Sequence, residues 1–376
     1  MDIRTAHSTR SSVDEAVREI ALAFDGAEPR AVLFFASSAF EPAAVSRRMQ
    51  DAFPGAHVFG CTTSGELVGG PGGGRMLKGA VVAMALGDDV VGDLCIEVVD
   101  LSAPDGVQRA FRRFEAHYGA SMLEMDPSRY VGFVLIDGLS VQEERVNERI
   151  GDLTNVYFIG GSAGDDLKFE TTHVLAGGQA YRNAAVLALL RPKVGFDFVK
   201  TQSFRVLDRQ LVPTRVDEAS RQVFEFDGAP AAQAYAAAVD CPVEAAGELF
   251  MQHPVGLMVG DEPFVRSPQR FDGDSIVFYC DVKEGMPLQL LESKDIVEDT
   301  RKALRDKAEE MGGFSAVVNF HCILRTLELE SKRQTDAYGA LFSEVPTVGF
   351  STYGESFIGH INQTSTMLVF GREPLA

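Results

Sequence analysis

Short apolar segments of strand type alternate with amphipathic helical segments along most of this chain, and this alternation restricts its fold more than any other feature. Residues 31–36 (AVLFFA) and 56–61 form apolar runs on either side of a helical pattern over residues 41–53. Residues 130–137 (YVGFVLID) and 316–324 (AVVNFHCIL) repeat the strand type further along. Strands that alternate with helices in this way favour sheets covered by helices. We therefore predict an α/β fold of mixed sheets with flanking helices.

Length and a change of composition predict two domains. The chain has 376 residues, which is enough for more than one hydrophobic core. After about residue 200 the regular alternation gives way to strand signals mixed with scattered charge. We place the boundary there. The predicted division is an N-terminal helix region over residues 1–27, a first domain over 28–198 and a second domain over 199–376.

Charge and cysteine content exclude several classes of partner and site. The formal net charge of −19 is spread along the chain, and such a surface repels phosphate backbones and anionic lipid. We expect neither nucleic acid nor a membrane as partner. The first residues contain no apolar signal segment, and no run approaches the roughly 20 apolar residues of a membrane span. Five widely spaced cysteines predict no disulfide framework. We expect a cytoplasmic protein.

A seven-residue pattern, G-x-[ST]-T-x-G-E, occurs twice. It stands at residues 60–66 (GCTTSGE) and 349–355 (GFSTYGE), each time after an apolar strand that a helix and a proline precede. A shorter relative, GGSAGD, stands at residues 160–165. One explanation is an ancestral duplication that relates the two domains. The other is that strand-to-turn junctions reuse glycine wherever φ is positive.

The stretch over residues 346–371 (PTVGFSTYGESFIGHINQTSTMLVFG) crowds hydrogen-bonding side chains between two strand-type runs. We expect the runs at 348–350 and 367–370 to form about one hairpin. A polar turn that satisfies its own backbone is one interpretation, and a binding site is the other. The residues that would contribute to the site are Gly349, Phe350, Ser351, Tyr353, Glu355, Asn362 and Thr364.

Known catalytic and nucleotide-binding patterns are incomplete. The glycine-rich loop at residues 69–75 (GGPGGGR) lacks both the Lys-Ser/Thr pair and the glycine spacing of a phosphate cradle, so a mobile lid or a linker is expected there. Ser162 occupies a G-x-S-x-G pattern, but a hairpin rather than a helix is expected after it. We predict no catalytic turnover, with a hydrolase based on Ser162 as a distant alternative.

His360 stands out among the seven histidines because it lies in a glycine-flanked polar cluster beside aromatic residues. A neutral imidazole in such a place suits a metal, and a satisfied structural histidine is the alternative. His321 and Cys322 are neighbours on one predicted strand, so they point to opposite faces and do not share one metal easily. The Cys241-Pro242 pair is either a thiolate haem ligand or, more simply, a proline that starts a helix.

Several stretches together resemble the FIST family of sensory domains, from about residue 28 to residue 371. The first half resembles its N-terminal domain and the second half its C-terminal domain. The six ordered blocks are VFGCTTSGEL (58–67), YVGFVLIDGLS (130–140), YFIGGSAGDDLKFE (157–170), NFHCILR (319–325), TVGFSTYGE (347–355) and HINQTSTMLVF (360–370).

This resemblance implies a sensory input module of signal transduction. The blocks GFSTYGE and HINQT look most like the stand-alone branch that senses nitric oxide, binds haem b and regulates a partner histidine kinase or cyclic-di-GMP enzyme. It implies NO or CO as the gas and His360 as the haem-iron ligand, with His321 as the alternative. Sensing of a small metabolite such as an amino acid, without haem, is the second interpretation. The exposed helices leave room for a homodimer.

If haem binds, several side chains are candidates for its surroundings. Apolar walls and a lid suit a haem b slot, and cationic side chains suit the propionates. The expected walls and cations are Phe350, Tyr353, Phe357, Met367, Arg325 and Arg372.

Overall fold

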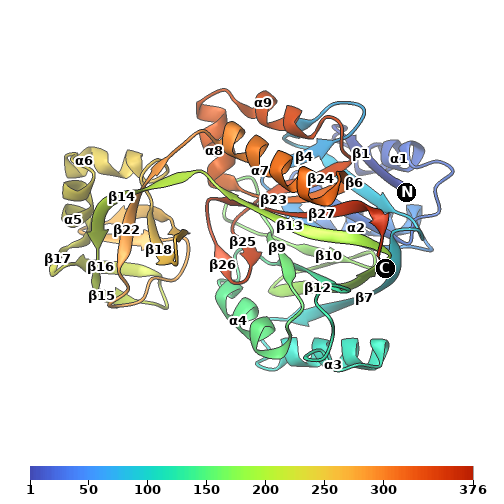
Figure 1. The fold of residues 1–376 in the computed structure, drawn as a ribbon, viewed down its shortest axis with the longest axis horizontal. Helices are drawn as coiled ribbons and strands as arrows, with labels where there is room; N and C mark the ends of the chain where they lie inside the picture. The colour runs from blue at the N-terminus through green and yellow to red at the C-terminus, as the bar shows by residue number, and fades with distance from the viewer. Residues whose placement is uncertain (376) are drawn as a thin grey trace.

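The computed structural model describes residues 1–375, and its main body consists of three β-sheets with helices on their outer faces (Figure 1). The inner faces of the three sheets meet in one apolar core, to which Leu33, Phe133 and Phe320 contribute from different sheets. The outer face of each sheet packs against its own helices in a separate cluster. Strands covered on both faces read as continuous apolar runs, which explains the runs in the sequence. The predicted α/β fold class is confirmed.

Each sheet is built around one of three consecutive chain units that share the same order of elements. The first unit runs strand, helix, strand, helix, strand, a two-strand hairpin and a final strand. Its elements are β1 (Ile3–Ser8), α1 (Val13–Ala23), β2 (Ala31–Ser37), α2 (Pro42–Ala52), β3 (His57–Thr63), β4 (Glu66–Gly69), β5 (Arg75–Leu77) and β6 (Val81–Leu86).

The second unit repeats this order of elements, with a longer loop between its third strand and its hairpin. Its elements are β7 (Val91–Asp100), α3 (Gly106–Tyr118), β8 (Val131–Ile136), α4 (Glu143–Leu153), β9 (Phe158–Ser162), β10 (Val174–Ala176), β11 (Gln179–Tyr181) and β12 (Ala184–Pro192).

The third unit contains a long insertion after its first strand and two short helices in place of one. Its elements are β13 (Val194–Gln202), α7 (Ile296–Met311), β23 (Phe314–Cys322), α8 (Ile323–Ser331), α9 (Thr335–Gly339), β24 (Thr347–Thr352), β25 (Glu355–Phe357), β26 (His360–Ile361) and β27 (Thr364–Pro374).

The strand pairings follow the same scheme in all three units. The sheet orders β1-β6-β2-β3, β7-β12-β8-β9 and β13-β27-β23-β24 correspond strand by strand. In each unit the second and third strands are parallel, and the other neighbours are antiparallel. The body is therefore a threefold repeat, which goes beyond the duplication considered from the sequence.

Each unit places its hairpin in the sheet of another unit. The hairpin β4–β5 extends the third unit at β24, β10–β11 extends the first at β3, and β25–β26 extends the second at β9. Strand pairs thus cross the predicted 198/199 boundary in both directions. One prediction is wrong: residues 348–350 and 367–370 do not form a hairpin, because β23 lies between β24 and β27.

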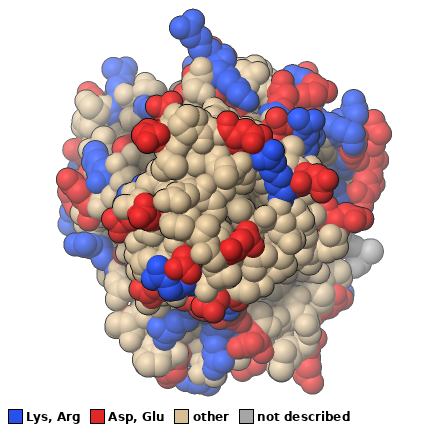
Figure 2. All heavy atoms as spheres, turned by 90° about the vertical axis from the view of Figure 1, so that its left-hand side faces the viewer, with Lys and Arg blue, Asp and Glu red and all other residues tan. Residues whose placement is uncertain are grey.

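Residues 203–293, between β13 and α7, form a separate lobe that we call the β-module, at the left of Figure 1. It consists of two small antiparallel sheets and an Ala-rich helix around their own apolar core. Its outer face is largely uncharged, with acidic and basic side chains scattered over it (Figure 2). Its main elements are β14 (Phe204–Leu211), β15 (Pro213–Asp217), β16 (Gln222–Phe226), β17 (Ala229–Pro230), α5 (Ala231–Ala238), α6 (Val243–Ala246), β18 (Val255–Val259), β19 (Glu262–Arg266), β20 (Pro268–Asp272), β21 (Ser275–Phe278) and β22 (Leu288–Ser293).

The glycine-rich loop between β4 and β5 is not a lid over a cavity. Gly70 donates its N–H to Phe342 O at 3.0 Å, and Gly74 donates to Ser343 Oγ at 3.1 Å. A Cβ on Gly74 would lie 1.9 Å from Gly339 O, so glycine is required for this close approach. The loop is therefore fixed against the α9 region. None of the helices within residues 1–375 has the length and apolarity that a membrane crossing demands.

One glycine at the same place in each unit explains part of the repeated sequence pattern. Gly60, Gly160 and Gly349 sit in the third strand, opposite a residue of the parallel second strand. A Cβ at these positions would lie 1.6, 1.7 and 2.3 Å from the carbonyl oxygen of that opposite residue. No side chain fits, so the pattern begins with glycine for a steric reason.

We expect Gly60→Ala to lower the free energy of unfolding by about 3 kcal/mol or to prevent folding, because the methyl group overlaps a backbone carbonyl. Gly55→Ala is the matched control, since nothing lies within 4 Å of a Cβ at Gly55. Urea titration of both variants measures the difference. Equal midpoints for the two variants would contradict the steric explanation.

Candidate functional site

The three turns that follow β3, β9 and β24 lock together through backbone hydrogen bonds. Ser64 N donates to Ser351 O at 3.3 Å, Tyr353 N to Ser162 O at 3.2 Å, and Gly164 N to Thr62 O at 2.9 Å. Each bond joins one unit to the next, so together they close a ring. We call residues 62–66, 160–166 and 349–355 the turn ring. It places three copies of one sequence pattern at a single point.

Two turns of the ring end in a buried glutamate that accepts hydrogen bonds from a threonine hydroxyl three residues earlier and from a backbone N–H. Glu66 accepts hydrogen bonds from the Thr63 hydroxyl and, at 3.0 Å, from Ala80 N. Glu355 accepts from the Thr352 hydroxyl and from the N–H and hydroxyl of Thr364, at 3.1 and 2.7 Å. Burial raises the pKa of Glu66 to about 8 and that of Glu355 to about 7. At pH 7 Glu66 is therefore mostly protonated, and Glu355 is about half protonated.

The second unit departs from this arrangement and so breaks the threefold symmetry. Its tight turn is replaced by a longer loop, in which Asp165 accepts the backbone N–H groups of Phe169, Glu170 and Thr171 at 2.7 to 3.0 Å. The Tyr353 hydroxyl donates to Asp165 and accepts Leu167 N at 2.9 Å. Burial alone would raise the pKa of Asp165, but these hydrogen bonds bring it below its usual value.

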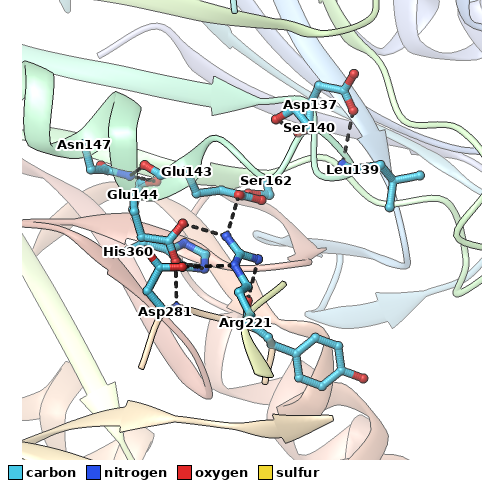
Figure 3. A network of polar contacts seen from close by, with 12 residues as sticks. Asp137, Leu139, Ser140, Glu143, Glu144, Asn147, Ser162, Arg221, Asp281 and His360 are labelled. Atoms are coloured by element: carbon cyan, nitrogen blue, oxygen red, sulfur yellow. Dashed lines mark hydrogen bonds and ion pairs between the residues drawn. The ribbon is translucent and has the colours of Figure 1, made fainter. Parts of the chain in front are cut away.

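An ion-pair cluster joins the β-module to the body close to this loop (Figure 3). Arg221 of the β-module pairs with Glu143 at 3.1 Å and Glu144 at 2.6 Å, both on the first turn of α4. It also pairs with Asp281 at 3.4 Å and donates to a backbone carbonyl at 2.9 Å. His360 Nε2 lies 4.0 Å from Glu144 Oε1. This cluster forms a wall across the cleft between the two parts.

The charges of this wall depend on one another. Burial by itself lowers the pKa of Arg221, but Glu143 and Glu144 raise it above its ordinary value. Burial and the negative charge of Glu144 raise the pKa of Asp281. Three carboxylates therefore share one guanidinium, and loss of Arg221 would leave them without a counter-ion at hydrogen-bonding distance.

On one side of the wall lies a cavity of about 330 Å³, which we call the Asn362 cavity. Body and β-module both contribute to it. Its lining is mainly apolar and aromatic, and Glu143 and Arg221 are its charged members. The lining from the body includes Leu139, Val141, Phe169, Ile323, Tyr353 and Asn362, and the lining from the β-module includes Arg221, Gln269, Val277 and Tyr279.

On the other side lies a cavity of about 730 Å³, which we call the His360 cavity. The side chain of His360 is 1% exposed, and neither ring nitrogen has a hydrogen-bond partner. Glu144, Glu148, Asp281, Arg266 and Lys283 give the lining both signs of charge. Its apolar members are Ile150, Val156, Tyr157, Phe158, Phe264, Met286 and Ile358.

The structure distributes the seven residues predicted for ligand binding over three environments. Tyr353 and Asn362 line the Asn362 cavity. Glu355 and Thr364 are buried and hydrogen-bonded to each other. The other three lie within β24, in buried positions: Gly349, Phe350 and Ser351.

Several side chains expected around a haem lie elsewhere. Met367 is buried in the body, and Arg325 donates to the hydroxyl groups of Thr201, Ser203 and Thr300. Arg372 donates to the carbonyl at the start of β23. His321 is buried with both ring nitrogens unpartnered, but it lines neither cavity. Burial, followed by the charge of Arg325, holds the pKa of His321 well below its usual value.

Ser162 does not have the surroundings of a nucleophile. It is fully buried in the turn ring, and its hydroxyl donates to Glu143 at 3.2 Å. No helix begins directly after it, because the loop to β10 follows. The geometry offers no support for the hydrolase alternative.

Comparison with known proteins identifies the family. The FIST N domain matches residues 30–229 and the FIST C domain matches residues 231–357. The chain belongs to the FIST family. FIST domains are sensory domains of signal transduction, so the predicted sensory role holds at this level. The two matches meet within the β-module, at the short strand β17 that leads into α5.

One curated protein is similar to part of the chain. It is the uncharacterized protein MJ1623 of Methanocaldococcus jannaschii, which is 23% identical over 278 residues. The alignment covers 68% of this chain and 53% of that protein, so the chain spans about half the length of this relative.

The residues that sequence reasoning missed are those of the ion-pair wall. Arg221 stands in a stretch of scattered charge, and Asp281 ends an apolar run. Glu143 and Glu144 look like ordinary acids at a helix start, where the helix dipole favours them. Two signals pointed to the region: the polar stretch over residues 346–371, which contains His360 and Asn362, and the third, imperfect copy of the repeated pattern, next to the loop that lines the Asn362 cavity.

The buried acids of the turn ring predict a characteristic pH dependence. Because the pKa values of Glu66 and Glu355 are higher in the folded than in the unfolded chain, the folded state binds more protons between about pH 4.5 and about pH 8. Stability therefore falls as pH rises through this window. From about pH 5 to about pH 9 we expect the free energy of unfolding to drop by about 3 kcal/mol or more.

The double variant Glu66→Gln and Glu355→Gln should remove most of this slope, since glutamine keeps the shape without the charge. Glu15→Gln with Glu309→Gln is the matched control at exposed positions. Urea unfolding across the pH range gives the comparison. A slope that persists unchanged in the buried double variant would show that other groups cause it.

Proposed function

We propose that this chain is a sensory domain without catalytic turnover, whose small-molecule ligand binds in the Asn362 cavity. The cavity has walls from both the body and the β-module, so a ligand there contacts two parts that the ion-pair wall also connects. A sensor requires a ligand that favours one arrangement of the protein over another. A binding site between two lobes meets that requirement directly.

Backbone strain around this cavity is the observation that carries the proposal. Val141, Leu167, Phe169 and Arg221 line it, and all four have positive φ angles of 53°, 62°, 54° and 54°. Residues other than glycine rarely adopt this backbone conformation, and each instance costs about 1–3 kcal/mol of folding free energy. Such strain gathers at ligand clamps and switch regions. Its concentration at one cavity supports a binding role for that cavity.

The output of the sensor is proposed to be a change at the surface of the β-module. Arg221 belongs to the β-module and Glu143 to the body, so a ligand beside this pair changes the link between the two. The partner that would respond is a histidine kinase or a cyclic-di-GMP enzyme, as the resemblance to the stand-alone branch implies. The proposed ligand is a small metabolite, and resemblance to the FIST family as a whole suggests molecules such as amino acids.

A thermal-shift screen of small metabolites, followed by hydrogen exchange, tests the site. A metabolite that raises the melting temperature should slow amide exchange on both sides of the cavity, at residues 138–143 in the body and 219–221 in the β-module. The reason is that a bound ligand holds the two walls together. Protection confined to one side, or found only around the His360 cavity, would contradict the proposed site.

Haem at His360 is the second candidate, and the unpartnered imidazole favours it. The ring lines the larger cavity, Arg266 and Lys283 would suit the propionates, and Phe264 and Met286 provide apolar contact. Haem would supply an iron that binds NO or CO. Glu144 lies 4.0 Å from Nε2 of the ring. If Nε2 held the iron, Glu144 would need to turn away. If Nδ1 held the iron, Glu144 could accept the proton on Nε2.

Titration of the purified protein with hemin tests this candidate. We expect a saturable one-to-one Soret band that His360→Ala abolishes and His57→Ala, at an exposed position, leaves unchanged. His321→Asn should also leave it unchanged, because His321 lines neither cavity. A band that survives in His360→Ala moves the ligand elsewhere, and broad absorbance without saturation rejects haem.

A further inference from the structure

The charged groups that line the Asn362 cavity neutralise each other. Arg221 pairs there with Glu143, and Glu143 also accepts the Ser162 hydroxyl at 3.2 Å. The excess carboxylates Glu144 and Asp281 line the His360 cavity instead. A charged ligand entering the Asn362 cavity would lose its hydration without gaining an unpaired counter-ion, and this desolvation is costly.

Two stacked aromatic rings give the cavity a flat apolar surface. The rings of Phe169 and Tyr353 lie 5.1 Å apart with an interplanar angle of 20°. The Tyr353 hydroxyl is already engaged with Asp165 and the N–H of Leu167, so this tyrosine offers its ring rather than its polar end. Phe169 is 47% exposed although its backbone is strained. Planar ligands suit such a surface.

The amide oxygen of Asn362 is buried and has no hydrogen-bond partner within the described chain. The residue is 1% exposed and lines this same cavity. A buried acceptor without a donor costs about 1–3 kcal/mol. A ligand N–H or O–H group would remove that cost, and it would also discriminate against molecules that lack a donor.

From these three observations we infer the class of ligand: a small, planar, largely apolar molecule without net charge, with one N–H or O–H donor for Asn362. The volume of about 330 Å³ limits it to a small ring system. This inference rests on the proposed sensory function and narrows it, because amino acids and other zwitterions fall outside the class.

Indole, 1-methylindole and tryptophan test each part of the inference. Indole has the planar shape and the donor, 1-methylindole lacks the donor, and tryptophan adds a zwitterion. The chain contains no Trp, so indole-type emission reports the probe alone. We expect saturable binding of indole, about tenfold weaker binding of 1-methylindole and weaker binding of tryptophan.

Asn362→Leu should reduce the affinity for indole about tenfold and leave 1-methylindole unchanged. Its melting temperature should not fall, because the amide oxygen has no partner to lose. Asn155→Leu is the matched control, since Asn155 lines the His360 cavity. Equal binding of indole by Asn362→Leu and wild type would overturn the role of Asn362.

The outcomes also separate this inference from the proposed function. Suppose that tryptophan binds more tightly than indole and protects residues 138–143 and 219–221 from exchange. The inference that the ligand is uncharged would then be wrong, and the proposed binding site would stand. If none of the three probes binds while a polar metabolite protects both walls from exchange, the inferred ligand class is likewise wrong and the proposed site stands. Indole binding that Asn155→Leu weakens and Asn362→Leu does not would move the site and overturn both.

Discussion

The hydrogen bonds between the three turns of the turn ring hold the architecture together. Each turn donates a backbone N–H to the next unit, and each hairpin continues into the sheet of another unit. No unit can complete its sheet without strands from elsewhere in the chain. Because unpaired backbone groups are costly when buried, the three units and their shared core are expected to form together. The boundary between the two FIST matches therefore does not separate the sheets, because each match contributes strands to the same sheets.

Departures from the threefold repeat coincide with the candidate site. The first and third units keep a tight turn closed by a buried glutamate, whereas the second replaces it with a strained loop around Asp165. The β-module is inserted into the third unit and faces this loop through Arg221. The β-module thus lines both cavities, and the loop of the second unit lines the Asn362 cavity. Strain is retained where the surrounding structure fixes it.

Local patterns predicted the elements well and their partners poorly. The runs at residues 31–36 and 130–137 are buried strands as expected, and the glycine pattern does mark a repeat. The predicted hairpin near the C-terminus failed because a strand 30 or more residues upstream, β23, inserts between its two arms. Tyr353 and Asn362 reach a cavity, whereas Phe350, with the same kind of sequence neighbours, is buried in the core. Alternation along a strand does not say which face meets a cavity.

By itself, the sequence determined the α/β class, the family and the repeated turn, since these depend on apolar periodicity and on glycines at fixed positions. Only the tertiary structure decided that the repeat is threefold, that hairpins are exchanged, and that Arg221 meets Glu143 and Glu144. Those contacts join residues 77 or more positions apart. The energies of these contacts depend on burial and charge in a cleft that exists only after the chain has folded. The residues around each partner in the sequence do not indicate which distant residue it will meet.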